Sequence, residues 1–524
     1  MKRNEIILIA AVIFIALFLR LFMLGAFPPS LYSDEAVNGV NTLQALESNN
    51  FKVFYPDNYG REGLFINVQA FFVWLFGPDM WVLHLVSALF GVLTVFGIYL
   101  LTKKLMGVYG NPNWARLTAL IATFLLATSF WHINFSRIGF RAITAPFWAV
   151  WAFYFLLLTR EKLLGAGRTN KDYFPWALIA GAVFGLGFHS YISYRVMPAI
   201  VLVLFLYWFF EARKQTNQPG ILKDFFWCVG LIILGAIITA SPLFVHFAKV
   251  PQDILGRTSE ISIFSSPTPL KDLAGNILKT LGMFNFFGDF NQRHNIAGQP
   301  QLFWLPGIMF LVGFYLACRS VIKKIYGFFS KTIEAMPSVI IPSEIASPAA
   351  YFFLLAWFAV ATLPVVISNE GLPHALRSIL MIPPIFILAA LGTVHLYSLF
   401  IAKLQFQPNF DSWRKILKFS TILVAILLIL EVYNSYFIVW GNDPKTKDAF
   451  SFDYNEKAYE LRALPNELIK FAVYDPGEVG INITQFLTNT ATPQGQKRHN
   501  LYYVPRDSAI LTHPPKGVYI TDLK

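Results

Sequence analysis

The sequence predicts an all-α membrane protein with many spans, and two observations lead to that fold class. Hydrophobic residues make up 56% of the 524 positions and charged residues 14%, and the mean hydropathy is +0.52. This composition is too apolar for an ordinary soluble enzyme. Apolar runs of the ~20 residues that a helix needs to cross a bilayer recur from Ile6 to Trp440. Because backbone groups in lipid must satisfy one another, such runs predict helices.

About eleven transmembrane helices are expected. The first run follows Lys2 and Arg3 and is too long for a signal-peptide core, so it predicts an uncleaved span. The piece from Leu64 to Phe76 is too short to cross and stops at Gly77-Pro78, which predicts an interfacial or re-entrant helix. The predicted spans cover residues 5–26, 81–102, 116–135, 142–159, 174–193, 196–212, 225–247, 302–318, 350–368, 376–399 and 417–440.

Lysine and arginine predict the orientation of these spans in a cell membrane. The net charge of +12 is dispersed between apolar runs, which argues against a nucleic-acid partner. With the N-terminus in the cytoplasm, the even-numbered connections carry most of the basic residues, as the positive-inside rule requires. These residues include Lys103, Lys104, Arg116, Arg160, Lys162, Arg213, Lys214, Lys323, Lys324, Lys403, Arg414 and Lys415.

The external face is then expected to receive loops 28–80 and 248–301 and the C-terminal tail. We predict a membrane module over residues 1–440 and a small extracytoplasmic α/β domain over 441–524. The strand-like runs Phe471–Tyr474 and Gly517–Ile520 suggest that domain.

The stretch from Pro28 to Ala36 is the most informative for function. Its two prolines end the first span, and Ser33 is suited to cap a new helix whose first turn holds Asp34 and Glu35. Acidic residues favour a helix N-terminus for structural reasons alone. Val40, Leu43 and Leu46 follow at helical spacing, so the helix is expected to lie along the outer membrane surface, with Asp34 at the lip of the bundle.

Other polar residues are predicted to gather on the same face. Any one arginine there is explained by snorkelling, but external turns should be poor in basic residues, so several together indicate a buried anion. Guanidinium groups match phosphate oxygens in pairs. His189, His294 and His374 share this face without the close spacing of a metal motif, so no metal site is predicted, and a divalent cation at the phosphate is left open. The gathered residues are Tyr59, Arg61, Glu62, Arg137, Arg141, Tyr191, Tyr194, Arg195, Arg293, His294, His374 and Arg377.

These residues resemble the GT-C superfamily of glycosyltransferases, in particular the family 39 type, which includes protein O-mannosyltransferases and lipid A aminoarabinose transferases. The resemblance runs from the first span to about Trp440. It rests on Ser33-Asp34-Glu35-Ala36 after that span and on Gly60-Arg61-Glu62-Gly63-Leu64 before the short apolar helix. The runs Asn291–Gly298 and Pro373–Arg377 look like those of uncharacterised bacterial members. The chain lacks a recognisable large inserted lumenal domain, which puts a protein acceptor in doubt.

The resemblance implies transfer of a hexosyl or pentosyl group from a polyprenyl-phosphate donor to a lipid, glycan or protein acceptor on the extracytoplasmic face. Asp34 would be the base, with Glu35 beside it, and the anomeric carbon would be inverted. Arg61, Arg137, Arg141 and Arg377 would bind the donor phosphate. Glu35 or Glu62 would position a sugar hydroxyl or balance an arginine. The remaining substrate contacts are expected from Tyr59, Tyr191, Tyr194, Arg195, Arg293, His294 and His374.

Two other functions remain open. A secondary transporter would carry ionisable residues near the midplane, broken helices and related halves. Glu431, inside the last predicted span, is the main residue that fits it. A non-catalytic assembly protein would act through its external tail. Uptake without consumption of a lipid-linked sugar distinguishes the first, and loss of function on deletion of the tail, but not in Asp34→Asn, distinguishes the second.

Overall fold

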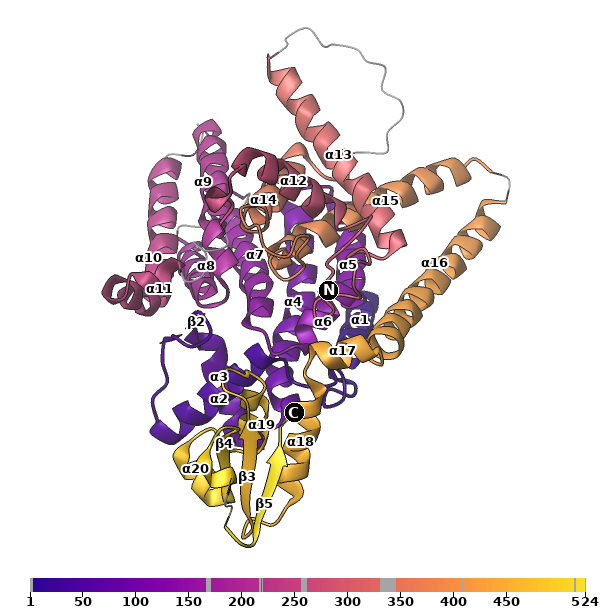
Figure 1. Ribbon diagram of the computed structural model, residues 1–524. Helices are drawn as coiled ribbons and strands as arrows, with labels where there is room; N and C mark the ends of the chain where they lie inside the picture. The colour runs from indigo at the N-terminus through magenta and orange to yellow at the C-terminus, as the bar shows by residue number, and fades with distance from the viewer. Residues whose placement is uncertain are drawn as a thin grey trace.

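The computed structural model describes residues 3–165, 171–215, 218, 220–255, 262–329, 345–407, 409–512 and 515–523. Within these ranges, nine helical segments are long and apolar enough to cross a membrane, which confirms the predicted polytopic α-helical fold (Figure 1). They contain α1 (Arg3–Leu21), α4 (Met80–Tyr109), α7 (Thr144–Leu164), α9 (Met197–Lys214), α10 (Ile221–Lys249), α13 (Trp304–Phe329), α14 (Pro348–Val366), α15 (Ile382–Leu404) and α16 (Phe410–Tyr433).

The other two predicted spans are helical but irregular. The third is broken into α5 (Pro112–Ala127) and α6 (Phe130–Arg137), which meet at an angle of 58°. The fifth consists of α8 (Phe174–Leu186) and a 3₁₀ turn ending at His189, which together are shorter than the other spans. Hydropathy located both segments, but it does not detect where a backbone bends.

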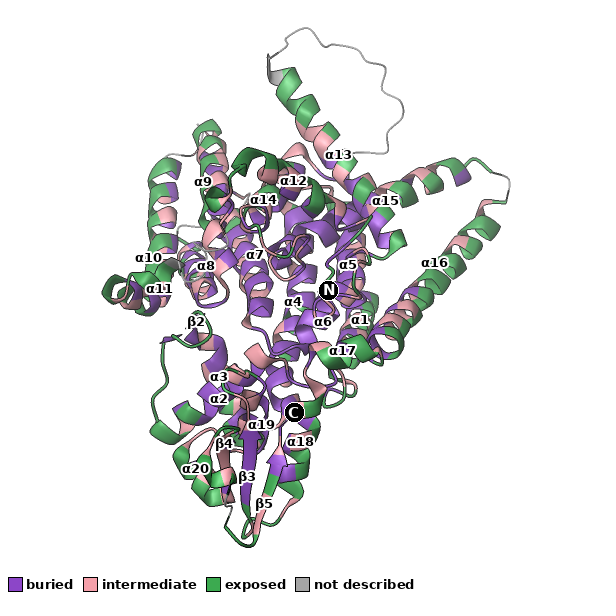
Figure 2. Cartoon of the chain, in the orientation of Figure 1, coloured by how far each residue is buried: buried purple, intermediate pink, exposed green. Residues whose placement is uncertain are grey.

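Burial separates the centre of the bundle from its outer helices (Figure 2). The first half of α15 is fully enclosed, from Ile382 to Gly392. Helix α16 stands apart from the bundle and exposes large apolar side chains such as Phe419 and Leu427. Exposed apolar surface on this scale suits contact with lipid tails.

Two buried arginines hold the broken span against α1. Arg20 of α1 donates to the carbonyls of Leu126 and Ala127, where α5 ends, at 3.3 and 3.1 Å. Arg137 of α6 donates in return to carbonyls in the last turn of α1 and the segment after it, at 2.8 to 3.2 Å. Helix ends leave carbonyls unpaired, which is costly away from water. Arg20 and Arg137 therefore supply hydrogen-bond donors to the carbonyls at the ends of α5 and α1. The carbonyls that Arg137 contacts are those of Leu19, Phe22, Met23 and Phe27.

The loop after α1 folds into α2 (Ser33–Ser48), the antiparallel hairpin β1 (Phe54–Tyr55) and β2 (Arg61–Glu62), and α3 (Gly63–Phe76), the short apolar helix that was predicted. The second long loop holds α11 (Gln252–Leu255) and α12 (Pro269–Gly282). Ser33 is the first helical residue of α2 and Tyr32 its N-cap, so the helix begins one residue earlier than a Ser33 cap implies.

The C-terminal segment contains α17 (Pro444–Ala449), α18 (Phe452–Ala463), α19 (Ile481–Leu487) and α20 (Pro493–His499). Its strands β3 (Ile469–Tyr474), β4 (Leu501–Pro505) and β5 (Val518–Asp522) form a parallel sheet in the order β4-β3-β5. Of the two strand-like runs seen in the sequence, Phe471–Tyr474 lies in β3 and Gly517–Ile520 overlaps β5. Figure 1 shows this segment beside α2 and α3.

The apolar face of α2, which was expected to rest on the outer membrane surface, packs against protein. Val40 and Leu43 are buried in a cluster with Ile483 and Phe486 of α19. A Cβ added to Gly39 would stand 2.5 Å from the Phe486 ring, so glycine is what permits this close approach. The C-terminal segment therefore supports the helix that carries Asp34.

Candidate active site

Asp34 lies in a cavity of about 300 Å³ at the start of α2. The cavity is formed where α2, the β1–β2 turn and the segment between α6 and α7 meet. Its volume could accommodate a small polar group, such as part of a sugar. The lining residues are Tyr32, Asp34, Asn38, Asn58, Tyr59, Arg61, Phe140, Arg141, Ala142, Tyr191 and Leu376.

The β1–β2 turn brings its polar side chains to this cavity by an unusual backbone. Asn58, Tyr59 and Gly60 all have positive φ values, of 50°, 64° and 84°. A Cβ on Gly60 would also collide with the ring of Phe54 at 2.5 Å, so glycine is required there. The turn directs the Asn58 side-chain amide to Asp34, whose Oδ1 accepts its hydrogen bond at 2.8 Å.

Arg61 is a buried cation at the cavity wall, with a side chain clamped by neutral groups. Its Nη1 donates to Asn38 Oδ1, its Nη2 to Asn41 Oδ1 at 2.6 Å, and its Nε to the Asp57 carbonyl at 3.3 Å. In the described part of the chain, no carboxylate lies within ion-pair distance of it. Burial, with Arg141 nearby, lowers the pKa of Arg61 to about 10, so the group stays protonated at neutral pH. A guanidinium that is fixed in this way and makes no direct ion pair in the described structure suits an anionic ligand.

A second cavity of about 350 Å³ adjoins the first and shares Asn58, Tyr59, Arg141 and Tyr191 with it. Glu62 bridges two of its arginines: Oε2 is 2.9 Å from Arg141 Nε, and Oε1 is 3.2 Å from Arg195 Nη2. Much of the remaining wall is apolar. The cavity thus combines guanidinium groups with a surface suited to a hydrocarbon chain; its other lining residues include Ile192, Val196, Pro364, Ile367 and Arg377.

Arg377 comes to this cavity from the turn before α15. Its Nη2 is 2.7 Å from Glu370 Oε2, and its Nη1 donates to the Glu370 carbonyl at 2.9 Å and to Ser368. The predicted pair of Arg141 and Arg377 therefore lines one cavity. Arg195, predicted only as a substrate contact, lies with them.

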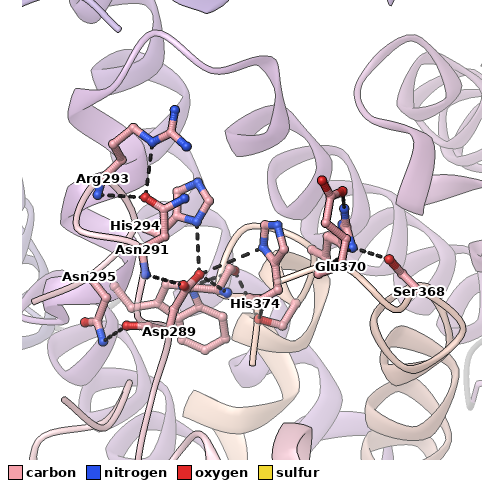
Figure 3. Close-up of polar contacts among 12 residues, drawn as sticks. Asp289, Asn291, Arg293, His294, Asn295, Ser368, Glu370 and His374 are labelled. Carbon is pink, nitrogen blue, oxygen red and sulfur yellow. Dashed lines mark hydrogen bonds and ion pairs between the residues drawn. The ribbon is translucent and has the colours of Figure 1, made fainter. Parts of the chain in front are cut away.

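Asp289 ties the second long loop to the same turn (Figure 3). Its Oδ2 accepts hydrogen bonds from His294 Nδ1 at 2.9 Å and from the Ala375 backbone at 2.8 Å. His374 Nδ1 stands 3.9 Å from the same oxygen. Burial and the positive groups around it lower the pKa of His374 well below its usual value, so that side chain is neutral. His294 and His374 thus lie together, next to Leu376 of the cavity rather than in its wall.

Arg293 belongs to the same loop and stacks on the cavity from outside. Its guanidinium carbon lies 3.9 Å from the centre of the Tyr32 ring. Its Nε donates to Asn291 Oδ1 at 3.1 Å. It therefore stabilises one wall residue without being among the residues that line the cavity.

Three predicted site residues are used elsewhere in the structure. Arg137 is fully buried and donates to backbone carbonyls near the end of α1, so its assignment to the donor phosphate is wrong. Glu35 accepts hydrogen bonds from His84 Nε2 at 2.7 Å and from the Gly139 backbone at 2.9 Å, and it is fully buried outside both cavities. Tyr194 packs against Phe184 and Phe188 and lines neither cavity.

Sequence reasoning missed Asn38, Asn58 and Asp289. Asn58 precedes Tyr59-Gly60, a turn signal between two apolar runs that would have placed it beside Arg61. Asp289 stands five residues before His294 in the same loop, but its link to His374 spans 85 residues. Local spacing cannot detect a contact of that length.

The comparisons with known proteins agree with this architecture. Residues 64–244 match the family model described as dolichyl-phosphate-mannose-protein mannosyltransferase. That range includes Arg141, Tyr191 and Arg195 and begins after Asp34 and Arg61. No curated protein sequence matches the chain.

Two solved structures share the fold over nearly the whole chain. The oligosaccharyltransferase AglB from Archaeoglobus fulgidus, in complex with an inhibitory peptide and a dolichol-phosphate, is 14% identical; the match covers 93% of this chain and 64% of that one, with a TM-score of 0.53. ArnT from Cupriavidus metallidurans, bound to undecaprenyl phosphate, is 13% identical; the match covers 99% of this chain and 90% of that one, with a TM-score of 0.50. The chain thus spans less than two thirds of the archaeal protein's length.

At these identities the likeness concerns the fold, to which the family model adds an independent match in sequence. Both findings agree with the resemblance to GT-C glycosyltransferases, and the chain shares the polytopic membrane fold of these two solved structures.

Proposed function

We propose that this protein is a membrane glycosyltransferase that takes a sugar from a polyprenyl-phosphate donor and transfers it to an acceptor on the extracytoplasmic face. One observation carries the proposal: a carboxylate, Asp34, and a buried guanidinium without a carboxylate partner, Arg61, line the same cavity. The solved relatives bind dolichol-phosphate and undecaprenyl phosphate, which supports a donor of this class.

The two cavities divide the donor between them. The apolar wall of the larger cavity, with Ile192, Val196 and Ile367, suits the first part of the lipid chain. Arg141 belongs to both cavities, so a phosphate beside it would lie where the two meet. Arg195 and Arg377 are the further cations of the larger cavity, and the sugar would then extend toward Asp34. In this assignment Arg195 takes the role that was predicted for Arg137.

Asp34 would act as the base for the incoming nucleophile. It would remove a proton from an acceptor hydroxyl or amine as that atom attacks the anomeric carbon opposite the phosphate, which inverts the centre. The bond between the anomeric carbon and the phosphate oxygen breaks, and its electron pair leaves with the phosphate. Asp34 loses its negative charge as the phosphate gains one, so the total charge of the site is conserved. Arg61 and Arg141 stabilise the charge at the leaving group.

The decisive experiment incubates purified protein with radiolabelled polyprenyl-phosphate sugars and candidate acceptors, and follows release of the lipid phosphate. Asp34→Asn should lower turnover by a factor of about 10² to 10⁴, because base catalysis is lost. Asp79→Asn is the matched control: it makes the same change in the same loop, at a carboxylate that pairs with Arg462 outside both cavities.

An Asp34→Asn protein with wild-type turnover and an unchanged thermal unfolding curve removes the base assignment. If wild-type protein consumes none of the polyprenyl-phosphate sugars tested, the proposed class of donor is wrong. Uptake of a solute into vesicles, without release of lipid phosphate, would instead indicate that the protein is a secondary transporter.

A further inference from the structure

The Asp289 cluster brings together three side chains of the kind that bind metal ions. One ligand atom each of Asp289, His294 and His374 can be chosen so that all three lie within 4.8 Å of one another. The residues come from two segments, 288–298 and 369–377, that are far apart in sequence. Figure 3 shows the two imidazole rings facing the one carboxylate. Imidazole nitrogen and carboxylate oxygen are ligands that Zn²⁺ and similar cations prefer.

His374 supplies an independent reason to expect a ligand. Its Nδ1 is buried and has no hydrogen-bond partner among the described residues. The closest carboxylate oxygen, Asp289 Oδ2, is 3.9 Å away and already accepts two hydrogen bonds. A buried polar nitrogen left unpaired costs stability, so such groups in native proteins normally have a partner. A cation between His374 and Asp289 would be that partner.

The separations are close to those of a metal site. Ligands at about 2.0 to 2.2 Å from a tetrahedral Zn²⁺ stand about 3.4 Å from one another. In the structure, Asp289 Oδ2 is 2.9 Å from His294 Nδ1 and 3.9 Å from His374 Nδ1, and the three ligand atoms all lie within 4.8 Å of one another. The carboxylate is already oriented, because its Oδ1 accepts the Asn291 backbone N–H at 2.8 Å. Side-chain adjustments of less than about 1 Å would close the set.

We propose that Asp289, His294 and His374 bind a divalent transition-metal ion of the zinc class. A fourth position would be left to water. The ion would fix the 288–298 loop to the turn before α15, which carries Leu376 and Arg377 into the two cavities. It acts as a structural clamp behind the cavity wall. This proposal does not depend on the glycosyltransferase activity, since a protein with another function could hold the same ion.

The test measures metal content, so it does not require a known substrate. Protein purified through a tag without histidine is loaded with Zn²⁺, passed through gel filtration in metal-free buffer and analysed by mass spectrometry of its metals. Wild-type protein should retain about one ion per chain. His374→Gln should lose it and still fold, because the His374 side chain makes no hydrogen bond in the described structure. Asp289→Asn should lose it as well, but it also disturbs the loop.

His246→Gln is the matched control. His246 Nε2 forms an equally close pair with Asp253, at 2.7 Å, and belongs to no described group of three metal-binding side chains. This variant should keep the ion. Co²⁺ in place of Zn²⁺ should give visible absorption bands in wild-type and His246→Gln protein and none in His374→Gln. Added Zn²⁺ should raise the unfolding temperature of wild-type and His246→Gln protein but not that of His374→Gln.

Wild-type protein that retains no ion and shows no shift in unfolding temperature overturns the proposal. So does equal retention by wild type and His374→Gln, which would place the ion elsewhere. Asp34→Asn separates the two proposals: it should lower sugar transfer by a factor of about 10² to 10⁴ while the metal content stays unchanged.

Discussion

Two arginines on either side of a short turn, Arg137 and Arg141, use the same side chain in different ways. Arg137, at the end of α6, is fully enclosed and gives its hydrogen bonds to backbone carbonyls. Arg141, four residues later, pairs with Glu62 and lines both cavities. The difference is in the surrounding backbone. Where a helix ends inside the bundle, its unpaired carbonyls accept hydrogen bonds from the guanidinium; at a cavity that a carboxylate also lines, the guanidinium can reach a ligand.

The comparison separates arginines that hold the fold from arginines that could hold a substrate. Arg20 and Arg137 brace the broken span without any carboxylate partner in the described residues. Arg61, Arg141, Arg195 and Arg377 line the cavities. Substitutions in the first group should therefore change stability, and substitutions in the second should change activity in a protein that still folds.

The largest effect is expected for Arg137→Met. Methionine fills similar space, but it leaves the carbonyls of Leu19, Phe22 and Phe27 without their donor. The expected loss is about 3 to 5 kcal/mol, similar to breaking a buried ion pair. Thermal unfolding in detergent and the yield of monodisperse protein measure it. Arg213→Met, on the predicted cytoplasmic end of α9, is the control. If both variants unfold at the wild-type temperature, the brace between α1 and α6 is not needed.

Arg141→Gln should give the next largest effect, on activity and not on folding. Glu62 keeps Arg195 as a partner at 3.2 Å, so the local structure should persist. Loss of one donor at a developing charge typically lowers the rate by about 10² to 10³. Release of lipid phosphate measures the loss of activity, and the thermal unfolding curve of the same sample shows whether the variant still folds. Wild-type release by a folded Arg141→Gln protein would exclude Arg141 from the phosphate.

The sequence was sufficient for features that repeat locally. The apolar runs located the spans, and the prolines and Ser33 located α2 to within one residue. The turn signal around Gly60 and the position of Arg61 were also readable, because neighbouring residues determine them. These features depend on helix periodicity and on turn chemistry, both of which a single sequence contains.

The sequence could not show which arginines, and which of the two adjacent acids Asp34 and Glu35, have structural roles and which line the cavities. Arg137 and Arg141 look equivalent in the same short segment, and only their distant partners distinguish them: backbone carbonyls of α1 and the segment after it for Arg137, and Glu62 for Arg141. Asp34 and Glu35 are adjacent, but Glu35 points to His84, which lies 49 residues away in the chain. The apolar face of α2 looked ready for lipid because its cover, Phe486, lies more than 400 positions later. Each of these outcomes depends on a long-range contact.

Arg61→Lys should have a smaller effect than Arg141→Gln, since it retains the charge. Lysine cannot reproduce the fork that joins Asn38 and Asn41, so its ammonium group will be less well fixed at the cavity wall. We expect turnover to fall about tenfold, which corresponds to ~1.4 kcal/mol of transition-state stabilisation. Arg61→Gln, which also removes the charge, should have a lower turnover than Arg61→Lys. Equal rates for the lysine and glutamine variants would mean that the charge of Arg61 does not act on the donor.

Arg462→Gln should have the smallest effect of these substitutions, and it serves as the reference for a nearly neutral change. Arg462 of α18 pairs with Asp79 at 3.3 Å, but its side chain is 47% exposed, so solvent weakens the attraction. Its removal should change stability by less than about 1 kcal/mol and leave turnover unaltered. The C-terminal segment should remain docked through Phe486 on Gly39, a contact that burial rather than charge stabilises. If Arg462→Gln instead lowers turnover, the polar contact is what positions α2, and the role given to Phe486 is wrong.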